Sequence, residues 1–408
     1  MTAVVVAIFV LSYALIATRR LSLLPIGRPA GALLGAVLMV AVGALTPEES
    51  FAAVDADTIV LLFALMVLSA YLERAGIFRR LSRAALLSFQ TPLGLLMGLA
   101  VLPGVLSAFL MNDAVCLFLA PMVVSTCRRA GLPMGPFLIA LATSANIGSA
   151  ATLVGNPQNM IIGSASGYAF SEFLRCAGPA SVVGLALNAV LLRIYYARRM
   201  PPSFQRDLPE DPVGGDEWPR LAPFITCCVT LGYFAGLHLG YTTLAGVMVL
   251  MIFDRREPTV AFGRVDWTLL VFFSALFVVV AGLAKTGLVE LAWSHASGVL
   301  DFESASGLGT FTAAMLLGSN VFSNVPMVLL TGPHLGELGD PALGWVLLAF
   351  TTTIAGNLTL VGSVANLIVA EQAKEHYELG FFEYLRFGLV STVLVLAAGV
   401  PLIMWTMS

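Results

Sequence analysis

The stretch NIGSAATLVGNPQN, residues 146–159, interrupts a long apolar region with glycine, proline and asparagine. Glycine and proline unwind helices, so we predict a helix over 134–170 that breaks within this stretch. The break exposes amides that attract anions or polar oxygens, and carbonyls that suit a cation. Such a backbone is tolerated in a membrane only beside protein or a cavity, so the stretch predicts a binding site there.

A second stretch, GNLTLVGSVAN at residues 356–366, resembles the first and predicts another broken helix. In both, Thr-Leu-Val-Gly is followed at the same spacing by asparagine, at Asn159 and Asn366. A Ser-x4-Asn pattern recurs at 107–112 and 319–324, and a basic residue precedes glycine by two positions at 74–76 and 285–287. Three matches in one order, at nearly one shift, indicate an internal duplication.

The amino-acid composition indicates whether this chain folds in water or in a bilayer. Charged residues make up 11% of its 408 residues and apolar residues 58%, with a mean hydropathy of +0.91. So few polar residues cannot cover the outside of a chain of this size in water. A soluble, disordered or disulfide-scaffold protein is therefore excluded, and a bilayer is the solvent that fits. The net charge of -3 does not indicate nucleic-acid binding, and neither a Walker motif, a metal-ligand cluster nor a catalytic pattern indicates an enzyme.

The basic residues predict the topology, because Lys and Arg concentrate on the cytoplasmic side of membranes. Placing the basic clusters on one face leaves only Arg175 and Lys285, of 21 basic residues, at or near the outer face. This arrangement predicts an all-α multi-pass protein of the plasma (inner) membrane, with both termini outside. It has about ten crossings, two re-entrant helical hairpins and two broken helices.

The two halves then face opposite ways, as in the inverted repeats of secondary transporters. The predicted organisation is a first repeat at 1–197 (hairpin 92–127, broken helix 134–170), a cytoplasmic linker at 198–220, and a second repeat at 221–408 (hairpin 305–336, broken helix 342–370).

Small polar residues at the hairpin tips and helix breaks are the candidate ligands, because their oxygens bind cations or cap exposed amides. The alternative is that they only satisfy the turns. We assign the first tip or cation site to Ser107, Asn112, Asn146 and Gly148. The second is assigned to Ser319, Ser323, Asn324, Gly356 and Asn357. The candidate substrate-binding residues are Thr152, Asn156, Asn159, Thr359, Ser363 and Asn366.

These motifs resemble the ion transporter superfamily, which includes arsenite efflux pumps, NhaD-type sodium/proton antiporters, the melanocyte P protein and dicarboxylate symporters. The resemblance covers nearly the whole chain. It implies hairpins that meet broken helices, a cation near each tip, and elevator motion against a dimeric scaffold. Asp113 and Val325 replace the tip threonines of the dicarboxylate branch, which weighs against a dicarboxylate.

Asp113 is the one acidic residue, of 24, that this topology places deep in the membrane. It is predicted to carry a proton, because burial disfavours a charged carboxylate. The alternatives are that it ligates Na⁺ with Ser107 and Asn112, or only caps the hairpin amides. We expect no Lys or Arg near either tip, which favours a neutral hydroxylated solute such as arsenous, silicic or boric acid.

The functional prediction is therefore proton-coupled export of a small inorganic oxyacid or anion such as arsenite. The alternatives are a Na⁺/H⁺ antiporter and a Na⁺-coupled anion or dicarboxylate symporter. An intramembrane enzyme would show a catalytic Ser, a His or paired carboxylates at membrane depth, where we expect one carboxylate, and a channel would lack closed inverted tips. We expect no cofactor beyond H⁺ or Na⁺ as coupling ion and no bound metal. The resemblance implies a homodimer, and some arsenite pumps also have an ATPase subunit.

Overall fold

The computed structural model describes residues 1–17, 27–204, 221–254 and 257–408, which are helical and contain no β-strand. Most of the predicted linker, 205–220, lies outside the described residues. The helices of the first half are α1 (Thr2–Ala17), α2 (Arg28–Ala41), α3 (Pro47–Ala52), α4 (Ala56–Arg74), α5 (Ile77–Ser88), α6 (Pro92–Phe109), α7 (Asn112–Ala130), α8 (Met134–Ser149), α9 (Pro157–Ser166) and α10 (Phe170–Tyr196), followed by a 3₁₀ turn, η1 (Ala197–Arg199).

The second half contains the same succession of longer and shorter helices. They are α11 (Leu221–Phe234), α12 (Leu239–Asp254), α13 (Thr259–Phe262), α14 (Trp267–Ala284), α15 (Leu288–Ala296), α16 (Ala305–Phe322), α17 (Asn324–Thr331), the 3₁₀ helix η2 (Gly332–Leu338), α18 (Pro341–Ala355), α19 (Val364–Ala373) and α20 (Phe381–Met407). Helices thus occupy the ranges predicted for both hairpins, and both predicted broken helices are interrupted, at 150–156 and at 356–363.

Five described helices are long and apolar enough to cross a membrane: α4, α6, α14, α20, and α10 together with η1. Further apolar helices of 10–17 residues include α1, α2, α11, α12 and α18. The prediction of an all-helical membrane protein is confirmed. The number of crossings, the re-entrant hairpins and the inversion of the repeats stay predictions.

The equivalent helices α4 and α14 have the same kind of N-cap and are followed by the same kind of turn. Asp55 caps α4 by accepting from the amide of Thr58, and Asp266 caps α14 by accepting from the amide of Leu269, each at 3.0 Å. The turns after α4 and α14 each need one residue in the left-handed backbone conformation. Glycine adopts this conformation without steric cost, at Gly76 (φ 74°) and at the equivalent position 287 (φ 75°). The repeated pattern therefore produces repeated local structure.

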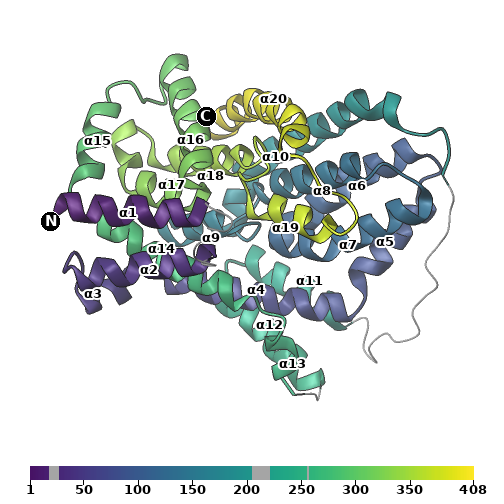
Figure 1. Cartoon of the computed structure of the whole chain (residues 1–408), viewed down its shortest axis with the longest axis horizontal. Coiled ribbons are helices and arrows are strands. Elements are labelled where there is room, and N and C mark those ends of the chain that lie inside the picture. Colours follow the sequence, from purple (N-terminus) through teal and green to yellow (C-terminus); the bar gives the residue numbers. More distant parts are fainter. Residues whose placement is uncertain (18–26, 205–220, 255–256) are drawn as a thin grey trace.

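The helices pack as two bundles. One, the flanking bundle, consists of α1, α2, α4, α11, α12 and α14. The other, the hairpin bundle, consists of α6–α10 and α16–α20. In Figure 1, α8, α10 and α20 of the hairpin bundle run beside one another, and α5 and α15 connect the two bundles in sequence.

Packing between the halves is reciprocal. In the flanking bundle α2 packs on α14, and its equivalent α12 packs on α4. In the hairpin bundle α19 packs on α7, and α9 packs on α17. A two-fold relation between the halves would produce such paired contacts. Two ion pairs follow the same rule, because equivalent residues Arg74 and Lys285 bind Asp254 and Glu49 of the opposite half, at 2.8 and 2.6 Å.

Glycine allows α6 and α8 to approach each other closely inside the hairpin bundle. A Cβ atom added at Gly148 would lie 2.0 Å from the backbone carbonyl oxygen of Gly104, a distance that real contacts do not allow. The obstacle is backbone rather than a flexible side chain, so the two helices would have to separate. This contact holds the first helix break beside the first hairpin.

We expect Gly148→Ala to lower the unfolding free energy by about 1–3 kcal/mol, the usual cost of overpacking. The apparent Tm in detergent measures the effect. Gly309→Ala in α16 is the matched control, because nothing lies within 4 Å of the added Cβ there, and alanine favours helix. Equal Tm values for the two variants would contradict the proposed close packing.

The first hairpin is tested by labelling single cysteines with a membrane-impermeant thiol reagent in a cysteine-free background. Arg79→Cys and Arg129→Cys should react from one face, and Glu49→Cys from the other. Met111→Cys at the tip should resist labelling from both faces, because Met111 is 3% exposed. Labelling of residue 111 from the same face as residue 49 would show two full crossings instead of a hairpin.

Candidate functional site

The first hairpin touches the break of the first broken helix through its backbone. The amide of Asn112, the first residue of α7, donates to the carbonyl of Gly155 at 2.9 Å. From the same break, the Thr152 hydroxyl donates to the carbonyl of Ala108 at 2.5 Å. Each interrupted segment thus satisfies backbone groups that the other leaves open, as buried polar groups require.

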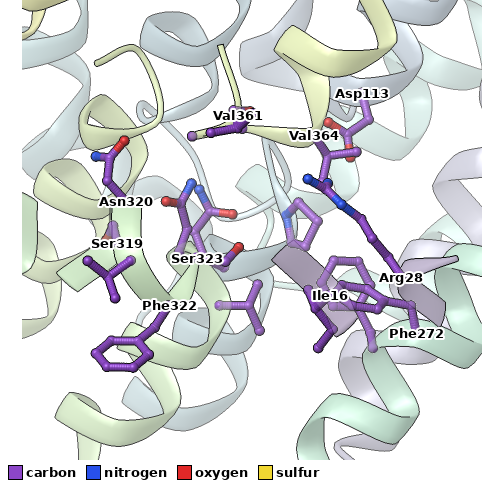
Figure 2. A pocket seen from close by; sticks show the side chains of 18 of the residues that line it. Ile16, Arg28, Asp113, Phe272, Ser319, Asn320, Phe322, Ser323, Val361 and Val364 are labelled. Atoms are coloured by element: carbon purple, nitrogen blue, oxygen red, sulfur yellow. The ribbon is translucent and has the colours of Figure 1, made fainter. Parts of the chain in front are cut away.

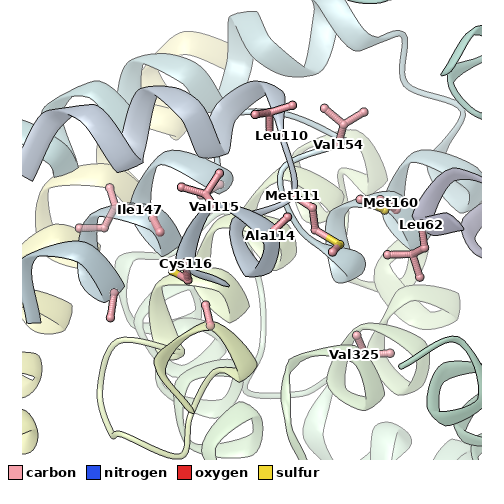
Figure 3. Close-up of a cluster of buried hydrophobic side chains, with 14 of the residues drawn as sticks. Leu62, Leu110, Met111, Ala114, Val115, Cys116, Ile147, Val154, Met160 and Val325 are labelled. Carbon is pink, nitrogen blue, oxygen red and sulfur yellow. The ribbon is translucent and has the colours of Figure 1, made fainter. Parts of the chain in front are cut away.

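The turn of this tip is apolar. Leu110 and Met111 connect α6 to α7 and are 4% and 3% exposed. In Figure 3 they lie among buried side chains that include Val154 of the first helix break and Met160 of α9. The polar residues follow within the first turn of α7, where the helix dipole favours the carboxylate of Asp113.

Asn146 in α8 is the centre of a hydrogen-bond network that joins the two halves. Its Nδ2 donates to Oδ1 of Asn357 at 2.9 Å and of Asn366 at 3.0 Å. Its Oδ1 accepts from Nδ2 of Asn112 at 3.0 Å and from the hydroxyl of Ser363 at 3.1 Å. One buried side chain therefore links the first hairpin to the second helix break.

The second break is held by the same kind of bond. Asn357 Nδ2 donates to the carbonyl of Thr143 at 3.1 Å. Asn366 Nδ2 donates to the carbonyls of Gly356 at 2.7 Å and Thr359 at 3.0 Å. Asn357 thus bonds α8 of the first half, whereas Asn366 bonds two carbonyls of the interrupted segment, in a region where an unpaired carbonyl is costly.

The first break uses its asparagines in the equivalent way. Nδ2 of Asn159 donates to the carbonyl of Thr152 at 2.9 Å, and Nδ2 of Asn156 donates to the hydroxyl of Ser149 at 2.9 Å. Thr353 of α18 lies beside them and accepts from Asn156 at 3.3 Å. Their amides are therefore committed to holding the break.

A cavity of about 160 Å³ lies where the tips and breaks meet the flanking bundle. Tyr13, Ile16, Arg28, Phe272 and Phe273 line it from the flanking bundle, and residues of both tips and both broken helices line the rest. A water needs roughly 10–15 Å³ by this measure, so the cavity holds on the order of ten waters or one small solute. Figure 2 shows Arg28 and Asp113 at one end of it, across from Ser319, Asn320 and Ser323.

Four helices begin at this cavity. Its lining includes residues from the first turns of α7, α9, α17 and α19, at Asp113, Gln158, Asn324 and Val364. Helix N-termini carry partial positive charge and free amides, so together they attract an anion or the oxygens of a polar solute.

The cavity wall also has polar atoms without a partner. Among the residues that the structure describes, the Ser319 hydroxyl and Oδ1 of Asn324 are buried and form no hydrogen bond. The equivalent Ser107 hydroxyl of the first hairpin is buried in the same state, although it does not line the cavity. Such atoms are normally satisfied in a folded protein, so those in the cavity wall are suited to a solute or ion.

Ser323, at the second tip, has an unusual backbone conformation. Its φ of 77° and ψ of 159° lie in a region that is essentially restricted to glycine. It is the only non-glycine residue with positive φ in the described parts of the chain. Strain of this kind costs about 1–3 kcal/mol and concentrates at ligand sites, and Ser323 lines the cavity.

The residues assigned from the sequence divide into two groups. Those that line the cavity are Asn112, Asp113, Ser319, Ser323, Asn324 and Ser363. Those that do not line it are Ser107, Asn146, Gly148, Thr152, Asn156, Asn159, Gly356, Asn357, Thr359 and Asn366. The network around Asn146 joins residues of both assigned tip sites, since Asn146 bonds Asn112 and Asn357; the two cation sites themselves stay predictions.

The expectation that no Lys or Arg lies near the tips is wrong. Arg28, the first residue of α2, lines the cavity together with Asp113. Its side chain reaches the tips because α2 packs on α14, which carries the lining residues Phe272 and Phe273. No local pattern indicates this contact. Asn320 was also not assigned, although it belongs to the repeated tip and accepts from the Thr359 hydroxyl at 3.0 Å.

Comparison with known proteins gives one family and several relatives. Residues 13–355 match the model of the CitMHS family, described as "Citrate transporter". The chain is 32% identical to "Putative transporter arsB" of Dictyostelium discoideum, over 98% of this chain and 91% of that protein. It is 34% identical to "Silicon efflux transporter LSI3" of Oryza sativa subsp. japonica, over 93% of both proteins.

A solved structure has a similar fold. The crystal structure of the Alcanivorax borkumensis YdaH transporter, reported to have an unusual topology, superposes with a TM-score of 0.54 at 16% identity. The match covers 99% of this chain and 97% of that one.

The network predicts that Asn146→Ala disrupts the site as well as the fold. It leaves buried partners in both halves unsatisfied, so we expect a loss of stability on the order of 3 kcal/mol and loss of solute binding. Tm and equilibrium binding of arsenite in detergent measure the two effects.

Asn188→Ala is the matched control, because Asn188 bonds Thr143, Ser144 and Ser391 and does not line the cavity. It should lower Tm and leave arsenite affinity unchanged, whereas equal affinity losses would contradict the assignment.

Proposed function

The chain belongs to the CitMHS citrate transporter family, and we propose that it exports a small inorganic oxyacid such as arsenite in exchange for protons. It is a membrane transporter with arsB-like relatives and not an enzyme. The relative named as a silicon efflux transporter supports the outward direction and an oxyacid as cargo.

The observation that carries the proposal is the cavity between the two bundles. It brings hydroxyl and amide groups of both tips together with one carboxylate, Asp113, which is 4% exposed. A buried carboxylate is suited to carry the coupling proton, and the polar groups are suited to hydroxyls of the solute. Its place between two bundles supports alternating access by elevator-type movement of the hairpin bundle.

Specific observations support two other forms of coupling. The four helix N-termini and Arg28 favour an anion, which supports a Na⁺-coupled anion or dicarboxylate symporter of the kind the family description suggests. The unpartnered oxygens of Ser319 and Asn324, in the same cavity wall as Asp113, suit Na⁺ and support a Na⁺/H⁺ antiporter.

The remaining parts of the proposal rest on the resemblance and on the charge pattern. We propose H⁺ as the coupling ion, with Na⁺ as the alternative, and a homodimer in the inner membrane with both termini outside. An ATPase subunit, as in some arsenite pumps, is a further possible partner.

Transport into proteoliposomes with an imposed pH gradient tests the function. Arsenite, silicic acid, Na⁺ and succinate are supplied in turn, and we expect arsenite flux that follows the proton gradient. Asp113→Asn should lower the gradient-driven flux at least about tenfold, a loss of 1.4 kcal/mol. Glu290→Gln, an exposed carboxylate on α15, is the control and should have no effect.

Three outcomes separate the alternatives. Arsenite flux that ignores the pH gradient contradicts proton coupling. Unchanged pH dependence in Asp113→Asn shows that the carboxylate only caps the hairpin. Na⁺-dependent succinate uptake without arsenite flux replaces the proposal with the symporter.

A further inference from the structure

Arg28 lines the central cavity, and neither the family match nor the sequence pattern gives it a role. We propose that Arg28 is a solute-binding residue which, together with Asp113, selects an uncharged hydroxylated solute. The inference rests on the proposed function and adds the basis of its specificity.

The charges of the cavity wall are the first step. Among the described lining residues, Arg28 and Asp113 are the two charged ones, so their charges cancel when Asp113 is ionised. Figure 2 shows both side chains at one end of the cavity. An anion would meet the Asp113 carboxylate there and a cation would meet the Arg28 guanidinium, and both ions would lose their hydration on entry. A neutral solute avoids this desolvation cost.

Hydrogen-bond chemistry is the second step. A guanidinium only donates and an ionised carboxylate only accepts, whereas a hydroxyl does both. An undissociated oxyacid can therefore donate a hydroxyl to Asp113 and accept from Arg28. Its other hydroxyls can pair with the Ser319 hydroxyl and Oδ1 of Asn324, which have no partner among the described residues.

Proton binding changes this balance. A protonated Asp113 carboxyl no longer accepts two hydrogen bonds. Its protonation also leaves Arg28 as the one charged side chain among the described lining residues. Both changes weaken the binding of a neutral oxyacid. Solute and proton then compete, as exchange requires. The other titratable groups that act near Asp113 are Asp266 at the start of α14 and the buried thiol of Cys116, one turn further along α7.

Arg28 lies in a different bundle from the other residues proposed to bind the solute. Arg28 belongs to α2 of the flanking bundle, whereas Asp113, Ser319 and Asn324 belong to the hairpin bundle. A movement of one bundle against the other therefore changes the distance from Arg28 to a bound solute. Solute affinity should differ between the two ends of the transport cycle.

The test measures binding to the purified full-length protein by isothermal titration at neutral pH, with arsenite as the neutral probe and inorganic phosphate as the anionic probe. The wild type should bind arsenite and not phosphate. Arg28→Gln should weaken arsenite binding at least about tenfold, with a smaller loss in Arg28→Lys. Arg79→Gln on the exposed face of α5 is the control and should match the wild type.

The decisive variant is Asp113→Asn, whose cavity keeps the positive charge of Arg28. It should gain phosphate binding, and the double variant with Arg28→Gln should lose it again. Phosphate binding that is equal in the single and double variants, or arsenite affinity unchanged in Arg28→Gln at an unchanged Tm, overturns the inference. If the wild type transports no arsenite but the phosphate pattern appears, the proposed cargo fails and the role of Arg28 stands.

Discussion

The side-chain hydrogen bonds of Asn146 lie at the centre of a site in which four helices begin inside an apolar region. Interrupted helices leave amides and carbonyls without partners, and a bilayer supplies none. The side-chain amides of Asn112, Asn357 and Asn366 meet at Asn146, and the bonds from Asn146 to Asn357 and Asn366 join the two halves. The network therefore connects the first hairpin tip to the second helix break, beside the cavity.

The cavity wall has two sides, one from each bundle. Tips and breaks share one hydrogen-bond network within the hairpin bundle, whereas Tyr13, Arg28 and Phe272 face them from the flanking bundle. Packing at this boundary is largely apolar, and apolar contacts do not impose the fixed geometry that hydrogen bonds do. The lining residues are therefore divided between the two bundles, and under the proposed elevator-type movement affinity and access would change together.

The sequence predicts the helices of both tips and the two helix breaks because each is a local pattern. Glycine, proline and asparagine at 146–159 and 356–366 mark the interruptions, and the duplication repeats the signal. It does not predict which polar residues face the cavity. Asn156 and Asn159 match a binding motif, yet their amides hold the break, and Arg28 reaches the cavity only through the packing of α2 on α14. Contacts between helices that are far apart in the sequence cannot be predicted from a local pattern.

The exchange of bonds between the halves has a consequence for biosynthesis. Asn146 is made long before Asn357, Ser363 and Asn366, and α7 and α9 before α19 and α17, on which they pack. The first half therefore enters the membrane with a polar core that it cannot satisfy alone. We therefore expect the first hairpin to reach its final packing only after the last third of the chain is translated. A chain that ends before Asn357 would keep Asn146 without these partners, at the cost of an unsatisfied polar group.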